Sequence, residues 1–264
     1  MPDRDAPRAH ADLERIAAAT ARAAAALVTA TYGRPDAVGH KSSPTDVVTQ
    51  TDLRAEELIR QRLREATPEG GVLGEEGATT DPGARLQWVI DPLDGTVNFL
   101  YGVPLFAVSI AAALDGEVVA GAVIDVLRGE LFSAYLGGGA RLNGEPIEVS
   151  GCASLPNALV ATGFSYQATL RDAQGAVAHR ALSRARDLRC FGSTALELCW
   201  VACARVDAYY QRDTEIWDRA AGALIAAEAG ARAELPCPEN DDLVIAATPG
   251  VFDDLWTVVQ LPVA

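Results

Sequence analysis

The chain has 264 residues, of which 49% are hydrophobic and 22% are charged, a composition typical of globular proteins that excludes a disordered chain. This length predicts one large domain or two fused halves. With 22 basic and 36 acidic residues, the formal net charge is −14, so most of the surface would repel nucleic acid, and we expect none as a partner.

The N-terminal region carries no secretory signal, and its most apolar run, residues 17–30, contains Arg22 and is too short to span a bilayer. The five cysteines form an odd set without a CxxC pair, so neither a disulfide framework nor a zinc site is predicted. We therefore expect a cytoplasmic protein with reduced thiols and no membrane partner.

The first half, residues 1–150, is predicted to be α+β with an antiparallel sheet. Helices are expected over residues 11–31 and from an N-cap at Thr51 or Asp52 to about Arg64. Short apolar strands are expected at 72–74 and 88–90. Alternating strands should follow at 105–114, 117–126 and 130–136, with turn signals at Asp115-Gly116 and Asn143-Gly144.

The second half, residues 151–264, alternates strands with helices, which suggests an α/β layer packed with the first half as one compact unit. Strands are expected at 158–162, 188–191, 206–210 and 243–246. Helices are expected at 173–186, from Thr194 with a capping box to Glu197, from Trp217-Asp218 to Gly230, and from Thr248-Pro249.

Three apolar segments end in carboxylates, and an acid at the end of such a segment should lie at the rim of a sheet. Residues 72–74 lead to Glu75, residues 88–90 lead to Asp91 and then Asp94, and residues 216–217 lead to Asp218. Any one of these acids alone could be a solvated turn residue.

The run 91–96, with the sequence DPLDGT, favours a site over solvated turns. Two carboxylates three residues apart around the stiff Pro92 can converge on one point. Gly95 permits close approach of the backbone to a ligand, and the amides of Gly95 and Thr96 are offered at the start of a turn or helix. Acids for a hard cation beside amides for an anion are what a metal-dependent phosphate site requires.

Residues 88–99 (WVIDPLDGTVNF) resemble the first hallmark of the inositol monophosphatase family, and residues 217–230 resemble the second. Residues 41–46, 51–52 and 74–76 also resemble the family, and the resemblance covers about residues 13 to 260. It implies a layered αβαβα sandwich, α+β and α/β in its two halves, that hydrolyses phosphate monoesters. It further implies a small phosphorylated substrate, dependence on magnesium, sensitivity to lithium and a homodimer.

The resemblance also implies site residues and two to three Mg²⁺ ions per subunit. By motif, Glu75, Asp91 and the Leu93 carbonyl would hold one ion, and Asp91, Asp94 and Asp218 a second. A third, weaker ion and its water network would involve Glu75, Asp52 and Lys41. The first half would thus carry most of the metal ligands.

Substrate contacts are implied in the same way. The amides of Gly95 and Thr96 would bind the phosphate, close to Leu93, Asp94 and Asp218. The segment Gly192-Ser193-Thr194 would contact the hydroxyls of the substrate. Glu75 with Thr96 would orient and deprotonate the attacking water. No histidine lies within these motifs, which disfavours a phosphatase with a histidine nucleophile.

One position departs from the family pattern and leaves the substrate open. Members that favour inositol phosphate carry a glutamate after two tyrosines, and here Gln211 follows Tyr209-Tyr210. Inositol 1-phosphate is the leading substrate. Histidinol phosphate, fructose 1,6-bisphosphate (with Arg212 on its second phosphate) and 3′-phosphoadenosine nucleotides are the alternatives. A non-catalytic, metal-bound regulatory scaffold is the reading from another functional class.

Overall fold

The computed structural model describes residues 6–34, 37–40, 47–236 and 242–260. In these ranges no helix has the length and apolar character needed to cross a membrane. The helices are α1 (Ala6–Thr31), α2 (Gln50–Ala66), α3 (Thr96–Tyr101), α4 (Ala168–Leu182), α5 (Thr194–Ala202), α6 (Ile216–Glu228) and α7 (Pro249–Gln260).

Two large sheets organise the molecule. The first has the order β3-β4-β5-β6-β7-β8-β9 and is antiparallel except for the β3–β4 pair. Its strands are β3 (Gly71–Gly74), β4 (Leu86–Asp94), β5 (Ala107–Leu114), β6 (Glu117–Asp125), β7 (Glu130–Tyr135), β8 (Ala140–Leu142) and β9 (Glu145–Pro146).

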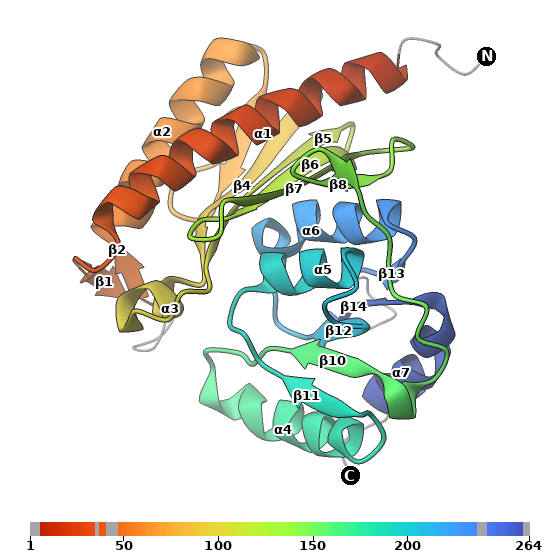
Figure 1. The fold of residues 1–264 in the computed structure, drawn as a ribbon. Coiled ribbons are helices and arrows are strands. Elements are labelled where there is room, and N and C mark those ends of the chain that lie inside the picture. The colour runs from red at the N-terminus through yellow and green to blue at the C-terminus, as the bar shows by residue number, and fades with distance from the viewer. Residues whose placement is uncertain (1–5, 35–36, 41–46, 237–241, 261–264) are drawn as a thin grey trace.

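The second sheet has the order β11-β10-β12-β14-β13, in which β10 is parallel to both of its neighbours. Its strands are β10 (Leu159–Thr162), β11 (Asp187–Arg189), β12 (Ala208–Gln211), β13 (Arg232–Glu234) and β14 (Val244–Ala247). A small hairpin of β1 (Ala37–His40) and β2 (Val47–Thr49) lies apart from both sheets, beside α3 (Figure 1).

The elements stack in five layers, which confirms the predicted αβαβα sandwich (Figure 1). Helices α1 and α2 cover the outer face of the first sheet, and α5 and α6 lie between the two sheets. Helices α4 and α7 cover the outer face of the second sheet. Buried apolar side chains fill each interface, including Trp88 and Phe132 from the first sheet and Tyr209 from the second.

Apolar spacing explains how the helices find their faces. On α1, the fully buried Ala17, Ala21, Ala24 and Val28 recur at intervals of four, three and four residues and form one stripe against the first sheet. The predicted hairpin turns are also confirmed. Asp115 and Gly116 have φ values of 51° and 87°, the left-handed pair that a tight two-residue turn requires.

Two predicted helix caps were wrong by one to three residues. Thr49, and not Thr51 or Asp52, caps α2, because its hydroxyl accepts from the amides of Thr51 and Asp52 while the Asp52 carboxylate accepts from the Thr49 amide. Ser193 caps α5 in place of Thr194, since its hydroxyl accepts from the Leu196 amide.

The fourth helix also differs from its prediction, since α4 runs from Ala168 to Leu182 and not over 173–186. Its N-cap, Gln167, makes no side-chain capping hydrogen bond, so no local signal marked the start.

Candidate active site

One cleft of about 560 Å³ brings together residues from both halves of the chain. The carboxylates of Glu75, Asp91, Asp94 and Asp218 all line it. So do the backbone segments 93–98 and 192–194 that the sequence had singled out. The acids predicted to lie at sheet rims therefore meet in one place.

The side chain of Asp91 shapes the backbone at the end of β4. Pairing between β4 and β5 shifts register between Asp91 and Asp94, and Asp91 Oδ1 accepts from the Leu93 amide at 2.9 Å. Gly95 then takes a φ of +93°, where a Cβ would lie 3.0 Å from the Leu105 carbonyl oxygen and 3.1 Å from that of Gly192. Only glycine fits this turn without strain.

The amides of Gly95 and Thr96 are available to a ligand. Within the described part of the chain, neither amide donates a hydrogen bond. Both residues line the cleft at the start of α3, next to the carboxylates, which is where the predicted contact with phosphate would need them.

A buried carboxylate of α2, Glu56, positions the backbone around Glu75. The Glu56 carboxylate, paired with Arg60 at 2.7 Å, accepts from the Glu76 amide at 2.8 Å. A Cβ at Gly74 would lie 2.7 Å from Glu56 Oε2, so the glycine lets the turn sit on this carboxylate. The backbone on both sides of Glu75 is thereby fixed at the end of β3.

Asp218 comes from the first turn of α6 and not from the end of a strand. Its Oδ2 accepts from the Glu215 amide at 2.8 Å, which closes a capping box at the start of the helix. The Ser109 hydroxyl donates to the Trp217 carbonyl at 3.4 Å and ties this helix start to β5. Asp218 therefore faces Asp91 from the middle helical layer.

Asp94 is held by the N-terminus of α5. Its Oδ2 accepts from the Ala195 amide at 2.8 Å and from the Ser193 hydroxyl. Burial raises the pKa of Asp94 to about 6, although these hydrogen bonds lower it. The predicted substrate residue Ser193 is thus engaged by a predicted metal ligand.

The carboxylates also act on one another. Burial, followed by the charges of Glu75, Asp94 and Asp218, raises the pKa of Asp91 well above its usual range. Burial, followed by the charges of Asp94 and Glu75, does the same to the pKa of Asp218. A bound cation would therefore favour full ionisation of this cluster.

The donor set fits magnesium by its chemistry, because four carboxylates and the Leu93 carbonyl are the hard oxygen ligands this ion prefers. It is not a finished cage. Among the described residues, no three His, Cys, Asp or Glu side chains converge closely enough to hold an ion.

Thr96 and Asp52 form a pair behind the cleft. The Thr96 hydroxyl lies 3.0 Å from Asp52 Oδ1 and 2.9 Å from the Leu93 carbonyl oxygen, and it can donate to either. Asp52 is fully buried and is not part of the cleft lining, which speaks for support of Thr96 over direct binding of an ion. Lys41, the other residue predicted for this network, lies outside the described residues.

The far side of the cleft carries the residues predicted for substrate contact. Gln211 Oε1 accepts from the Tyr209 hydroxyl at 2.8 Å and lies 3.5 Å from the Thr194 hydroxyl. Aromatic and acidic side chains continue this wall, namely Phe164, Tyr166, Asp213 and Glu215. Gln211 thus lines the cleft, as predicted.

Two residues with a positioning role were missed in the sequence. Asn98 Nδ2 donates to the carbonyls of Leu105 at 2.8 Å and Phe191 at 2.7 Å, and joins two loops across the cleft. The buried Glu197 carboxylate accepts from the amides of Phe191 and Gly192. Asn98 lies within the motif 88–99, which could have indicated its role. The sequence indicated only a capping role for Glu197.

Comparison with known proteins places this site in a family. The model of the inositol monophosphatase family matches residues 10–255. The chain is 46% identical over 236 residues to an inositol-1-monophosphatase, SuhB, of Mycobacterium tuberculosis, covering 85% of this chain and 81% of that one. It is 40% identical over 260 residues to a Nus factor SuhB of Pseudomonas aeruginosa, with 93% and 94% covered.

A solved inositol monophosphatase from Anabaena superposes with a TM-score of 0.84 at 30% identity, over 95% of this chain and 96% of that one. The fold agrees with this likeness, and the chain belongs to the inositol monophosphatase family.

Proposed function

We propose that this protein is a magnesium-dependent phosphate monoester hydrolase whose leading substrate is inositol 1-phosphate. The observation that carries the proposal is one cleft lined by Glu75, Asp91, Asp94 and Asp218 beside the free amides of Gly95 and Thr96. The oxygen donors suit divalent cations, and the amides suit phosphate oxygens.

Glu75, Asp91, the Leu93 carbonyl, Asp94 and Asp218 would hold Mg²⁺, which would supply positive charge for the phosphate oxygens and lower the pKa of a water molecule. The amides of Gly95 and Thr96 then bind the phosphate and orient it for in-line attack. Glu75 accepts the proton of the attacking water as the water oxygen bonds to phosphorus, the ester P–O bond breaks, and the leaving oxygen takes up a proton from solvent. Because the Thr96 hydroxyl directs its proton to Asp52 or the Leu93 carbonyl, its oxygen is free to accept a hydrogen bond from the same water.

The leaving alcohol would face Gln211, Thr194 and the wall around Phe164 and Asp213. A relative 46% identical is named an inositol-1-monophosphatase, which supports inositol phosphate as the substrate. Gln211 can contact ring hydroxyls as donor and acceptor but adds no charge.

Histidinol phosphate stays a second candidate, because the exposed acids Asp213 and Glu215 line the cleft where a cationic leaving group would lie. A bisphosphate is less well supported. Arg212, proposed for a second phosphate, lines a neighbouring cavity and not this cleft, with its Nη2 at 3.4 Å from the Val259 carbonyl oxygen.

Phosphate release with and without Mg²⁺ tests the proposal. The panel consists of inositol 1-phosphate, histidinol phosphate, fructose 1,6-bisphosphate, a 3′-phosphoadenosine nucleotide and glycerol 2-phosphate, compared by kcat/KM. We expect release only with the metal, and Asp94→Asn should remove most of it, by at least about 100-fold, while the fold persists. Near-normal turnover of that variant at saturating Mg²⁺ would contradict the metal assignment.

A non-catalytic regulatory role is the alternative from another class, since a relative 40% identical is named a Nus factor. That reading expects no phosphate release from any member of the panel. Inhibition by lithium, a cytoplasmic location and a homodimer complete our proposal, and light scattering on the purified protein tests the last of these.

A further inference from the structure

Two loops form the part of the cleft that would face the leaving alcohol. Residues 163–167 follow β10, and residues 212–215 follow β12, which ends at Gln211. Because β10 and β12 are parallel neighbours, both loops leave the same edge of the second sheet. Their relative position therefore sets the shape of the substrate wall.

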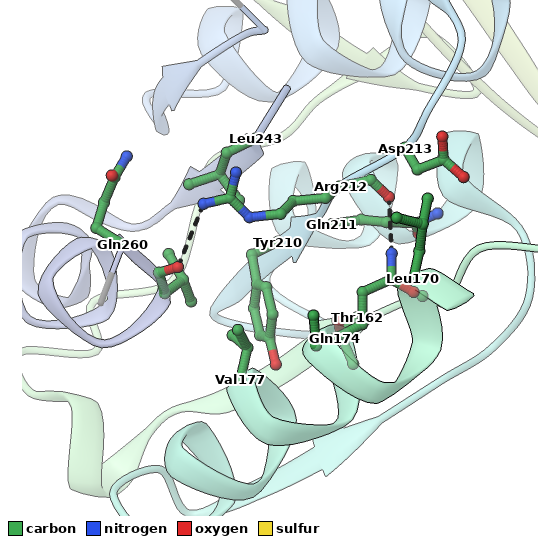
Figure 2. Close-up of a pocket in the computed structure, with 13 residues that line it drawn as sticks. Thr162, Leu170, Gln174, Val177, Tyr210, Gln211, Arg212, Asp213, Leu243 and Gln260 are labelled. Carbon is green, nitrogen blue, oxygen red and sulfur yellow. Dashed lines mark hydrogen bonds between the residues drawn. The ribbon is translucent and has the colours of Figure 1, made fainter. Parts of the chain in front are cut away.

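A cavity borders these loops on the side away from the cleft. A cavity of about 240 Å³, separate from the catalytic cleft, lies between α4, α7 and β12 (Figure 2). It is lined largely by apolar side chains, including Leu170, Val177 and Leu243, and reaches Gly163 and Gln211. Because this cavity separates the loops from parts of α4 and α7, the hydrogen bonds that the loops make contribute to their position.

Gln174 makes those hydrogen bonds from α4. It is buried, and its Oε1 accepts from the Ser165 amide at 2.8 Å while its Nε2 donates to the Arg212 carbonyl at 3.1 Å. Figure 2 shows the second bond crossing from α4 to the backbone after Gln211. The amide of Gln174 therefore bonds the 163–167 loop through its oxygen and the 212–215 loop through its nitrogen.

The two loops also meet directly in front of Gln174. The Ser165 hydroxyl donates to the Asp213 carboxylate, and the backbone at Gly163 packs against the Gln211 side chain so closely that a Cβ there would overlap Gln211 Oε1. A small change in loop separation would thus move Gln211 itself.

We propose that Gln174 is a positioning residue for substrate selection: it fixes the two loops and so holds Gln211 against the leaving alcohol. Gln174 itself does not line the cleft, and its two hydrogen bonds go to the backbone of Ser165 and Arg212 and not to the carboxylates proposed to bind metal. The inference rests on the proposed phosphatase function, but its consequence is confined to the choice of substrate.

Two variants separate the two hydrogen bonds. Gln174→Met keeps the length of the side chain and removes both bonds, whereas Gln174→Glu keeps the acceptor for Ser165 and loses the donor to Arg212. Gln61→Met is the matched control, because the Gln61 amide bonds Glu65 on the exposed surface of α2.

We expect Gln174→Met to lower kcat/KM for inositol 1-phosphate by roughly three- to thirtyfold, mainly through KM. The value for glycerol 2-phosphate, whose short alcohol makes fewer contacts with this wall, should change much less, as should the Mg²⁺ concentration for half-maximal activity. Hydrogen exchange at the Ser165 amide should accelerate in Gln174→Met and stay slow in Gln174→Glu.

If kcat/KM fell by the same factor for both substrates, or for neither, their ratio would be unchanged. Gln174 would then have a purely structural role, and the inference would be overturned. If the wild-type protein released no phosphate at all, the proposed function would fail first. Calorimetric binding of inositol 1-phosphate to wild type and Gln174→Met would then replace the kinetic ratio, and equal affinities would overturn the inference as well.

Discussion

Gln211 shows how one side chain can be fixed by neighbours that take no part in the reaction. The buried Tyr209 hydroxyl donates to its Oε1, and the glycine at 163 leaves room for its amide. Burial raises the pKa of Tyr209 well above its usual range, so this hydroxyl keeps its proton and remains a donor. In the proposed reaction, the leaving alcohol would therefore meet a neutral amide at this position.

Gln211→Glu should shift selection towards inositol 1-phosphate. A hydrogen bond to a charged acceptor is worth about 1.5–3 kcal/mol and one to a neutral acceptor about 0.5–1.5 kcal/mol. The ratio of kcat/KM for inositol 1-phosphate to that for glycerol 2-phosphate should rise by roughly three- to thirtyfold, with unchanged dependence on Mg²⁺.

The control for that prediction is Gln260→Glu, the same change at a residue that lines the neighbouring cavity and not the cleft. It should leave the ratio where it is. An unchanged ratio in Gln211→Glu itself would show that this position does not select the substrate.

Single residues in strict motifs were predictable from the sequence, and residues acting through contacts were not. Glu75, Asp91, Asp94 and Asp218 each follow an apolar segment, and all line the cleft. Gln174 lies in a helix whose start no sequence signal marks. Its role is visible only in the structure, where it bonds Ser165 of one loop and Arg212 of another. Such long-range hydrogen bonds leave no local pattern.

At the scale of elements, the site is assembled from ends. The residue after β3, the C-terminal part of β4 and the first turn of α6 contribute carboxylates to one cleft, and the start of α5 holds Asp94 through an amide. The sequence predicted that these ends carry acids. It could not predict which backbone groups receive them, because that depends on how the two sheets are stacked.

This assembly makes the metal-free protein sensitive to pH. Folding raises the pKa of Asp94 from 3.8 to about 6, so between these values the folded protein holds a proton that the unfolded chain has lost. The free energy of unfolding therefore falls as pH rises from about 4 to 6, and the loss persists above that range. Binding of Mg²⁺ favours the ionised carboxylates and opposes the loss.

Asp94→Asn removes this buried charge, so without metal it should be more stable than wild type at pH 7.5, by up to about 3 kcal/mol, and nearly equal to it at pH 4. Added Mg²⁺ should stabilise wild type more than the variant at pH 7.5. Denaturant unfolding with EDTA or Mg²⁺ at several pH values measures both effects. If the difference in free energy of unfolding between variant and wild type did not change from pH 4 to 8, the proposed cost of the buried Asp94 charge would be contradicted.

At the scale of the whole molecule, α6 packs between the two sheets and contributes one carboxylate to the cleft. It lies in the middle layer and carries Asp218 in its first turn. It approaches the first sheet at Gly121 of β6, where a Cβ would lie 3.0 Å from the Ala221 Cα and 3.1 Å from its Cβ. It approaches α5 at Gly222, against Leu198. If α6 moves as a rigid element, these close approaches would determine how far Asp218 lies from the carboxylates of β4.

Gly121→Val tests whether layer spacing controls the site. Local preference favours valine in a strand, so the strand alone would gain stability from the change. The tertiary contact has the opposite sign, because the added methyl groups would force α6 away from the sheet at a cost of about 1–3 kcal/mol. We expect the tertiary term to dominate, with a lower free energy of unfolding and a several-fold higher Mg²⁺ requirement, since Asp218 moves with α6.

Selection between inositol 1-phosphate and glycerol 2-phosphate should stay as in wild type in Gly121→Val, because the loops around Gln211 are not touched. Gly151→Val is the matched control: nothing lies within 4 Å of a Cβ at that glycine, and its φ is not in the left-handed region. If Gly121→Val lowered stability but left the Mg²⁺ requirement unchanged, Asp218 would be positioned by its own capping box with Glu215, and the spacing of the layers would matter for folding alone.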